Sequence, residues 1–256
     1  MRDLKLTKVI IRVDDVTQLN LFELADWFTK NHPDVPLCVY LIRTHLWNKN
    51  GWKKLKEMIV KYGWEVGGHT RNHPYLSSLS EDEIKLEVIG NIRDIEEGLK
   101  SVGLNYKVLS FAYPFGDFDN RVKNILREIG IKIGLTYPDG FPYDSIYSWT
   151  LDDNFEVGIT QDDKPPLSVL NKRFDIIHNK RGLYILCLHT RNWRYSFIKD
   201  IKYFLKIRRP IKEIGLILLK FFKIKNKWRI LDSHLKYIKN KGDVYFTTFR
   251  EVFQNE

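Results

Sequence analysis

The chain has 256 residues, of which 43% are hydrophobic and 14% aromatic, so it is not an intrinsically disordered chain. Its length allows a sizeable core in one α/β domain or two small ones. The formal net charge is +10, and residues 197–230 alone hold eleven Lys or Arg against two Asp or Glu. Cys38 and Cys187 lie far apart inside apolar runs, which favours buried free thiols over a disulfide framework.

The apolar runs of the chain give no sign of export or membrane insertion. The N-terminal residues MRDLKLTKVIIRVDD enter a strand-like run without the pattern of a signal peptide. The longest apolar run, IGLILLKFF (214–222), is too short to cross a bilayer core of about 30 Å. We therefore expect no transmembrane helix and a soluble or peripheral cytoplasmic protein.

Short runs rich in Val, Ile and aromatic residues alternate with segments of helical period. In chain order the patterns predict strand 8–15, helix 19–31, strand 36–42, helix 51–62, strand 64–70, helix 80–101, strand 108–114, helix 119–129, strand 132–137, helix 168–181, strand 182–190 and strand 243–249. Residues 147–153 fit a strand less well. Ser80 and Glu83 form a capping box at the start of the longest helix. Several strands are apolar on both faces, so we predict a parallel α/β fold, a barrel or an incomplete one, in a single domain over 1–256.

The tetrapeptide His-Thr-Arg-Asn occurs twice, at residues 69–72 and 189–192. The flanking sequences of the two copies do not match, which argues against a tandem repeat. Each copy follows a predicted strand, and in parallel α/β folds the carboxyl ends of the strands meet at the edge that holds the active site. The two copies therefore indicate two strand ends that face one cleft.

Two adjacent carboxylates, Asp14 and Asp15, follow the first predicted strand. Carboxylates after a buried strand are costly unless a cation, a hydrogen-bond network or solvent compensates their charge. An acidic pair that forms a turn and caps the next helix would have the same sequence. The pair alone therefore leaves a functional and a structural interpretation open.

Three histidines follow other predicted strands. His69 and His73 are four residues apart, so both imidazoles can lie on one side of a helical turn and bind one metal ion. Pro74 prevents an ordinary helix from continuing, which predicts a single turn or a structured loop. Two structural histidines are the alternative, and a lone histidine such as His189 is more often structural than catalytic.

Taken together, the strand ends supply two Asp and three His side chains. One Asp and two His can form a 2-His-1-carboxylate metal site, and the remaining Asp and His can act as a base and an acid. Hydrolysis of an unactivated amide needs a metal-activated water, a base to deprotonate it and an acid to protonate the leaving amine. The combination indicates a metal-dependent amide hydrolase.

On these residues the sequence resembles the polysaccharide deacetylase family, also called the NodB homology family or carbohydrate esterase family 4. RVDDV (12–16) is similar to the family motif T-F-D-D-G, and HTRNH (69–73) to H-[ST]-x-x-H. AYPFG (112–116) is similar to R-x-P-[YF]-G, and LCLHT (186–190) to the late L-x-H motif. The resemblance covers about residues 8–190 and 231–253, and it leaves 194–230 as a basic insertion.

The resemblance implies a distorted (β/α) barrel with fewer than eight strands and a divalent metal ion, commonly Zn²⁺. By motif position the metal ligands would be Asp15, His69 and His73. The resemblance also implies roles for three further residues: Asp14 would be the catalytic base, His189 the catalytic acid, and the backbone N–H of Phe115 a donor to the tetrahedral oxyanion.

The chain departs from the family pattern at the arginine that positions the base. Ala112 stands at this motif position, so another group must hold Asp14. Arg12 and Arg71 are the candidates, chosen by proximity in the sequence. The departure permits a diverged enzyme and also an inactive relative.

Three smaller departures accompany it. Val16 replaces the glycine after the paired Asp, which predicts a different backbone conformation at the entrance to the site. Cys187 replaces the leucine of the late motif. The Asp that usually tunes the acid histidine has no clear counterpart, and Asp152 and Asp153 are candidates.

The basic segment 197–230 can form an amphipathic helix with lysines on either side of its apolar face, which would comprise Ile211, Ile214, Leu218, Phe221 and Phe222. Such a helix can pack on the barrel with a solvated basic rim, or it can bind an anionic membrane surface. Nucleic-acid binding is not expected, because no nucleic-acid recognition motif accompanies the charge.

These expectations lead to one predicted function and two alternatives. We predict a metal-dependent deacetylase that removes an N-acetyl group from an amino sugar, with a glycolipid or lipid-linked saccharide at the inner membrane face as substrate. The first alternative is a degenerate scaffold that binds a sugar or a lipid head group without catalysis. The second is a hydrolase of the same superfamily that acts on an amide outside sugars.

Overall fold

A computed structural model of the protein describes residues 6–137, 153–189 and 226–254. The strands are β1 (Thr7–Val16), β2 (Leu37–Leu41), β3 (Glu65–Gly68), β4 (Ser110–Ala112), β5 (Ile133–Leu135), β6 (Gln161–Asp162), β7 (Leu183–His189) and β8 (Val244–Phe246). The helices are α1 (Gln18–Asn31), α2 (Lys49–Tyr62), α3 (Glu81–Ser101), α4 (Asn120–Glu128), α5 (Leu167–Asn179) and α8 (Phe249–Gln254), and residues 226–239 are also helical.

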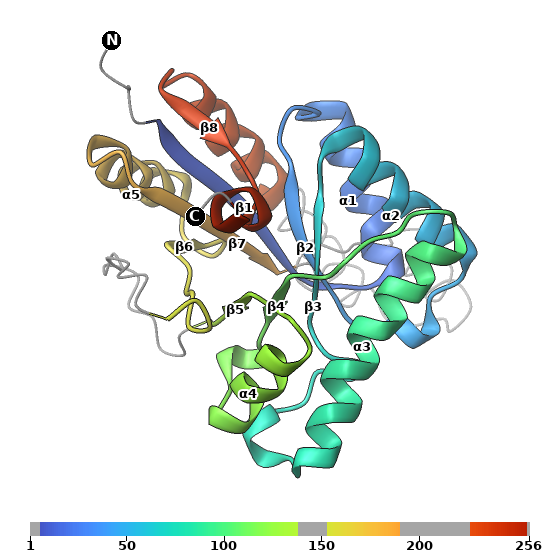
Figure 1. Ribbon diagram of the computed structural model, residues 1–256. Coiled ribbons are helices and arrows are strands. Elements are labelled where there is room, and N and C mark those ends of the chain that lie inside the picture. Colours follow the sequence, from blue (N-terminus) through green and yellow to red (C-terminus); the bar gives the residue numbers. More distant parts are fainter. Residues whose placement is uncertain (1–5, 138–152, 190–225, 255–256) are drawn as a thin grey trace, which may run out of the picture.

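All the strands belong to one parallel sheet, in the order β5-β4-β3-β2-β1-β7-β6. The amino-terminal part of β1 also pairs with β8, while its carboxyl-terminal part pairs with β2. Figure 1 shows the sheet curled, with α1 to α5 around its outside and α8 across its middle. This arrangement confirms the predicted incomplete (β/α) barrel.

The two faces of β1 bury different parts of the core. Val9, Ile11 and Val13 pack in the cluster that joins the sheet to the outer helices. Ile10 belongs to the second cluster, inside the curl, where Phe249 of α8 closes one end. Side chains alternate along a strand, so Arg12 and Asp14 follow Ile10 onto the inner face.

The sequence patterns located α1 to α5 to within about two residues at each end, whereas the helical residues 231–239 were not predicted. α3 begins after Ser80 with the predicted capping box to Glu83. The two-residue strand β6 was not predicted. The candidate strand 147–153 and the basic segment lie outside the described residues, apart from Asp153 and residues 226–230. Among the helices of the described part, none combines the length and the apolar character needed to cross a bilayer.

Candidate active site

The carboxyl end of β1 presents two buried carboxylates on opposite sides of the backbone. The pairing of β1 with β2 shifts its register between Val13 and Val16, and Asp15 has a left-handed backbone with φ 60°. Val16 remains in β1 and pairs with Leu41. The positive φ therefore lies at Asp15, one residue before the position at which the sequence departs from the family glycine.

Asp15 lies beside both histidines of the predicted pair. Its Oδ1 is 3.0 Å from Nε2 of His73 and 3.6 Å from Nε2 of His69. The ligand atoms of the three residues lie within 4.8 Å of one another. Nδ1 of His69 is 2.7 Å from the carbonyl of Ala112, so Nδ1–H donates there and the lone pair of Nε2 faces Asp15. This donor set fits a divalent metal ion such as Zn²⁺.

A structured loop, one of the two predicted possibilities, carries the histidine pair. Thr70 and His73 both have left-handed backbones, with φ 64° and 63°, and the hydroxyl of Thr70 accepts the His73 N–H at 2.9 Å. Asp15 belongs to the same group of strained residues. Left-handed non-glycine residues cost about 1–3 kcal/mol each and persist only where the surroundings fix them. Two of the three candidate metal ligands, Asp15 and His73, are thus in strained conformations.

Helix α3 fixes this loop from behind. Asn91 is fully buried, and its Oδ1 accepts the His69 N–H at 2.9 Å. Its Nδ2 donates to the Leu41 carbonyl and to the Thr44 hydroxyl, both at 3.0 Å. Asn91 thus ties the ends of β2 and β3 together under the site, a role that the sequence analysis missed.

The second carboxylate, Asp14, is held by an arginine of its own strand. Nε and Nη2 of Arg12 donate to Oδ1 and Oδ2 of Asp14 at 2.8 and 2.7 Å. Burial raises the pKa of the Asp14 carboxyl, but the charge and hydrogen bonds of Arg12, together with the nearby His69 and His189, outweigh it, and the pKa lies below its ordinary value. The other candidate, Arg71, instead pairs with Asp94 on α3 at 2.6 and 2.8 Å.

His189 ends β7 directly beside Asp14, with which it pairs in register. The ring of Tyr137 packs edge-on against His189 at 5.0 Å. Nδ1 of His189 is buried without a hydrogen-bond partner among the described residues. Asp153 does not serve as that partner, because it binds Lys123 at 3.2 Å, and Asp152 lies outside the described residues.

Asp14, Cys187 and His189 form a second group of closely spaced ligand atoms. Both oxygens of the Asp14 carboxylate already accept from Arg12, whose positive charge would repel a metal ion at this position. The Cys187 thiol is fully buried, 3.7 Å from Asp14 Oδ2, and burial raises its pKa well above the ordinary value. This second group is therefore poorly suited to bind a metal ion.

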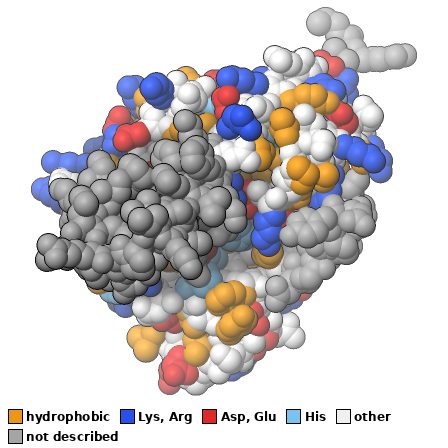
Figure 2. All heavy atoms as spheres, turned by 180° about the vertical axis from the view of Figure 1, so that it is seen from behind, with side chains coloured by type: hydrophobic (Ala, Val, Ile, Leu, Met, Phe, Trp, Pro, Cys, Tyr) orange, Lys and Arg blue, Asp and Glu red, His pale blue; other side chains and the backbone are white. Residues whose placement is uncertain are grey.

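A cleft of about 530 Å³ opens over the site, with Asp15, His73 and Phe115 in its lining. Phe115 has a left-handed backbone with φ 59°, and its ring stacks on Tyr75 at 4.1 Å and meets His73 edge-on at 4.5 Å. Phe115 is 39% exposed and Tyr75 is 52% exposed, so an aromatic pair stands at the rim. Figure 2 shows histidine side chains reaching the surface on this side of the molecule.

The structure brings the six predicted site residues to one edge of the sheet. Asp14, Asp15 and His189 come from the ends of β1 and β7. His69 and His73 follow β3, and Phe115 follows β4. Four segments far apart in the sequence thus meet at one edge, as the carboxyl ends of parallel strands do. Among the six residues, Asp15, His73 and Phe115 line the cleft.

Comparisons with known proteins agree with this geometry. The model of the polysaccharide deacetylase family matches residues 3–134, just over half of the chain. Chitin deacetylase 1 of Saccharomyces cerevisiae is 29% identical over 96 residues, which are 38% of this chain and 30% of that protein. The chain thus spans less than a third of the length of this curated relative.

Solved structures share the fold. A family 4 carbohydrate esterase from Bacillus anthracis is 14% identical, with a TM-score of 0.59 over 99% of this chain and 86% of its own. A carbohydrate esterase family 4 pseudoenzyme from the same organism is 21% identical, with a TM-score of 0.54 over 92% of this chain and 62% of its own. With the matched family model and the barrel architecture, these comparisons show that the chain belongs to the polysaccharide deacetylase family.

Proposed function

We propose that the protein is a metal-dependent hydrolase that removes an N-acetyl group from an amino sugar. The observation that carries the proposal is the convergence of Asp15, His69 and His73 beside the paired Asp14 and His189. Family membership supports a deacetylase, and an N-acetylated saccharide is the corresponding substrate class. The rim aromatics Phe115 and Tyr75 support a sugar ligand, because sugar rings can pack on exposed aromatic faces.

In this proposal Asp15, His69 and His73 hold the metal ion. A divalent cation such as Zn²⁺ supplies Lewis-acid polarisation and lowers the pKa of water. The buried carboxylate and the fixed His69 tautomer give a donor set with the charge and geometry that such a cation needs.

The chain's own groups carry the proton transfers. Asp14, oriented by the Arg12 fork, accepts a proton from the attacking water. The water oxygen bonds to the amide carbon, and the Phe115 N–H donates to the oxyanion that develops there. His189 then donates a proton to the amide nitrogen as the C–N bond breaks, which releases acetate and the free amine.

The test of this proposal compares the wild-type protein with Asp14→Asn on N-acetylglucosamine oligosaccharides. We expect acetate release by the wild-type protein loaded with Zn²⁺, and at least a hundredfold lower kcat for D14N because the base is lost. D14N should still bind stoichiometric metal. Wild-type protein that binds Zn²⁺ yet releases no acetate from these substrates would contradict the sugar assignment, and a screen of other amides would then test the non-sugar hydrolase.

A non-catalytic scaffold is the second candidate, since Ala112 replaces the family arginine and a pseudoenzyme shares the fold. The intact fork between Arg12 and Asp14 favours the enzyme, because it keeps an oriented carboxylate beside His189 although the family arginine is absent. The two candidates differ in turnover. A scaffold protein would bind saccharides without releasing acetate, and D14N would leave its saccharide affinity unchanged.

We also propose that the substrate is a glycolipid or a lipid-linked saccharide at the cytoplasmic membrane face. In this proposal residues 1–256 form a single domain, and residues 194–230 are an insertion within it. Its support is the charge of residues 197–230, eleven basic against two acidic side chains. Cosedimentation with vesicles tests it. We expect binding to vesicles with anionic lipid that weakens with salt, whereas equal binding to neutral vesicles, or none to either, would refute it.

A further inference from the structure

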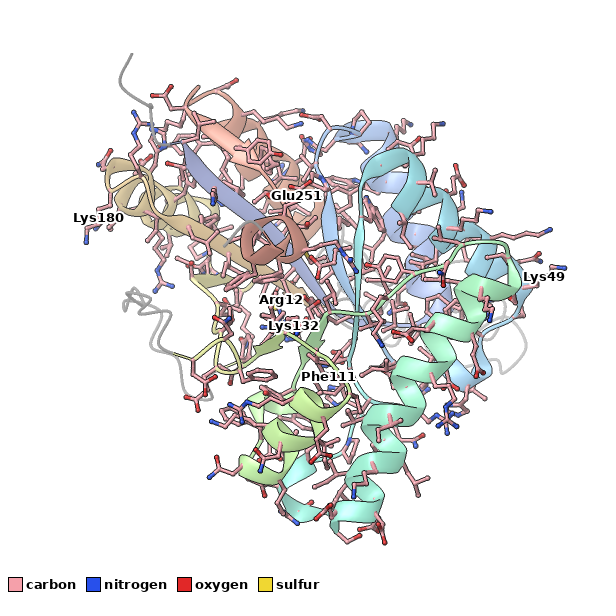
Figure 3. All side chains as sticks on the ribbon, viewed as in Figure 1. Arg12, Lys49, Phe111, Lys132, Lys180 and Glu251 are labelled. Carbon is pink, nitrogen blue, oxygen red and sulfur yellow. The ribbon has the colours of Figure 1, made fainter. Side chains whose placement is uncertain are left out.

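Arg12 is a fully buried arginine in the interior of the curled sheet, and Figure 3 labels its position. Two of its nitrogens donate to the two oxygens of Asp14, at 2.8 and 2.7 Å. The third, Nη1, donates to the Thr136 carbonyl at 2.8 Å. The guanidinium also lies over the Tyr40 ring, 5.6 Å from its centroid. Its three nitrogens therefore all have acceptors, and its position is fixed on several sides.

Two residues of the interior cluster around this side chain are small, which leaves room for it beside Tyr40. Arg12 pairs in register with Cys187 of β7, whose side chain also points inward. Ala112 of β4 belongs to the same interior cluster as Cys187 and Tyr40. A packed interior accommodates a large side chain only where others are small. The two departures at Ala112 and Cys187 are thus compatible with an arginine that enters from β1.

The arginine connects the candidate base to the loop that carries the oxyanion donor. Thr136 accepts from Arg12 through its carbonyl, and its hydroxyl donates to the Gly116 carbonyl at 3.2 Å. Gly116 directly follows Phe115, and its N–H donates to the Tyr113 carbonyl. One guanidinium thus contacts the Asp14 carboxylate and the residue that supports the Phe115 turn.

We propose that Arg12 is a positioning residue that orients Asp14 and braces the Phe115 loop, in place of an arginine at position 112. The proposal rests on the proposed deacetylation, in which Asp14 takes the proton from water. A planar guanidinium holds both carboxylate oxygens in one plane, whereas a lysine ammonium supplies a single point charge. The orientation of Asp14 therefore depends on the arginine fork and not only on its charge.

The test is the Arg12→Lys protein, with Arg181→Lys as a matched control. Arg181 pairs with Asp243 at 2.6 Å, next to the amino-terminal end of β7 and so at the opposite edge of the sheet from the site. We expect kcat for R12K to fall about 10- to 100-fold, the usual effect of losing an outer partner of a site residue. KM should stay within about threefold of the wild-type value. The metal stoichiometry should not change. R181K should match the wild-type protein in all three.

Restoring the arginine at the family position gives a second readout. We expect Ala112→Arg to raise kcat in the Arg12→Gln background, because a fork from β4 would again hold Asp14. Thermal unfolding shows whether each variant is folded. If R12Q does not fold, the kcat of R12K alone decides the role of Arg12. A folded R12K with kcat within threefold of the wild type would overturn the role of Arg12. Wild-type protein without activity would instead contradict the deacetylase itself.

Discussion

Replacing Asn91 by alanine should destabilise the loop that carries His69 and His73. In the native protein this fully buried amide accepts the His69 N–H and donates to the Leu41 carbonyl and the Thr44 hydroxyl. Thr44 keeps a second partner, Asp94, at 2.9 Å, so alanine leaves two main-chain groups without their bonds. Each buried group left unsatisfied costs about 1–3 kcal/mol, which predicts a loss of about 2–6 kcal/mol in the free energy of unfolding.

The same substitution should also weaken metal binding. The His69 backbone is held by Asn91 while its ring is held by the Ala112 carbonyl, so the loss of one support lets the ligand move. Partners that orient a metal ligand change affinity about 10- to 100-fold when they are removed. We expect a decrease of that size in Zn²⁺ affinity.

Urea unfolding of the metal-free protein and Zn²⁺ competition with a chelator measure the two effects separately. Asn124→Ala is the matched control, because Asn124 lies exposed on α4 and its side chain accepts one bond from Arg127 at 3.3 Å. N124A should stay within about 0.5 kcal/mol of the wild type. An N91A protein that loses less than about 1 kcal/mol and keeps its Zn²⁺ affinity would refute the proposed support by α3.

Two further predictions concern the barrel itself. His234 is buried between Asn171 and Tyr184, and burial lowers its pKa from 6.5 to about 4. The unfolded chain therefore takes up this proton below pH 6.5, and the folded protein takes it up only near pH 4. The free energy of unfolding thus decreases by about 3 kcal/mol as the pH is lowered from 6.5 to 4. His234→Gln should lack this part of the pH dependence in urea unfolding, and an identical slope for both proteins would contradict it. Gly67→Ala should lower the free energy of unfolding by about 1–3 kcal/mol, because the added methyl would overlap the Tyr40 ring inside the barrel, and an unchanged urea midpoint would show that the interior is not packed there.

The parallel sheet and most helices could be predicted from the sequence, because each depends on a local pattern. Buried strands such as β2 and β7 are apolar on both faces, and α3 begins at its capping box. β6 could not be found in this way, since it has only two residues and both are polar. Its place in the sheet depends on pairing with β7, which no local signal encodes.

The convergence of the site could be predicted for a related reason. Polar residues at the carboxyl ends of parallel strands meet at one edge whatever their distance in the sequence. The choice between Arg12 and Arg71 was left open, although strand alternation contains the answer. Residues two apart on one strand share a face, so Arg12 meets Asp14, whereas Arg71 lies in a loop and pairs with α3.

The sequence contains weaker patterns, or none, that would predict the other contacts at the site. Asn91 interrupts the apolar stripe of α3 between Val88 and Ile92, and a polar residue in a buried stripe indicates a partner that must be satisfied. The packing of Tyr137 on His189 follows from how β5 and β7 lie in space, and no sequence pattern predicts it. The carboxylate partner expected for His189 is not found among the described residues.

Mass-spectrometric analysis of an N-acetylglucosamine oligosaccharide, incubated with the Zn²⁺-loaded wild-type protein, tests the central claim most directly. The account predicts products that have lost one or more acetyl groups, with acetate released in equal amount. The products should be absent after chelation, return on adding Zn²⁺, and remain absent with D14N despite its bound metal. Unchanged oligosaccharide in the presence of stoichiometric Zn²⁺, or equal turnover by D14N, would contradict the assignment of these residues to deacetylation.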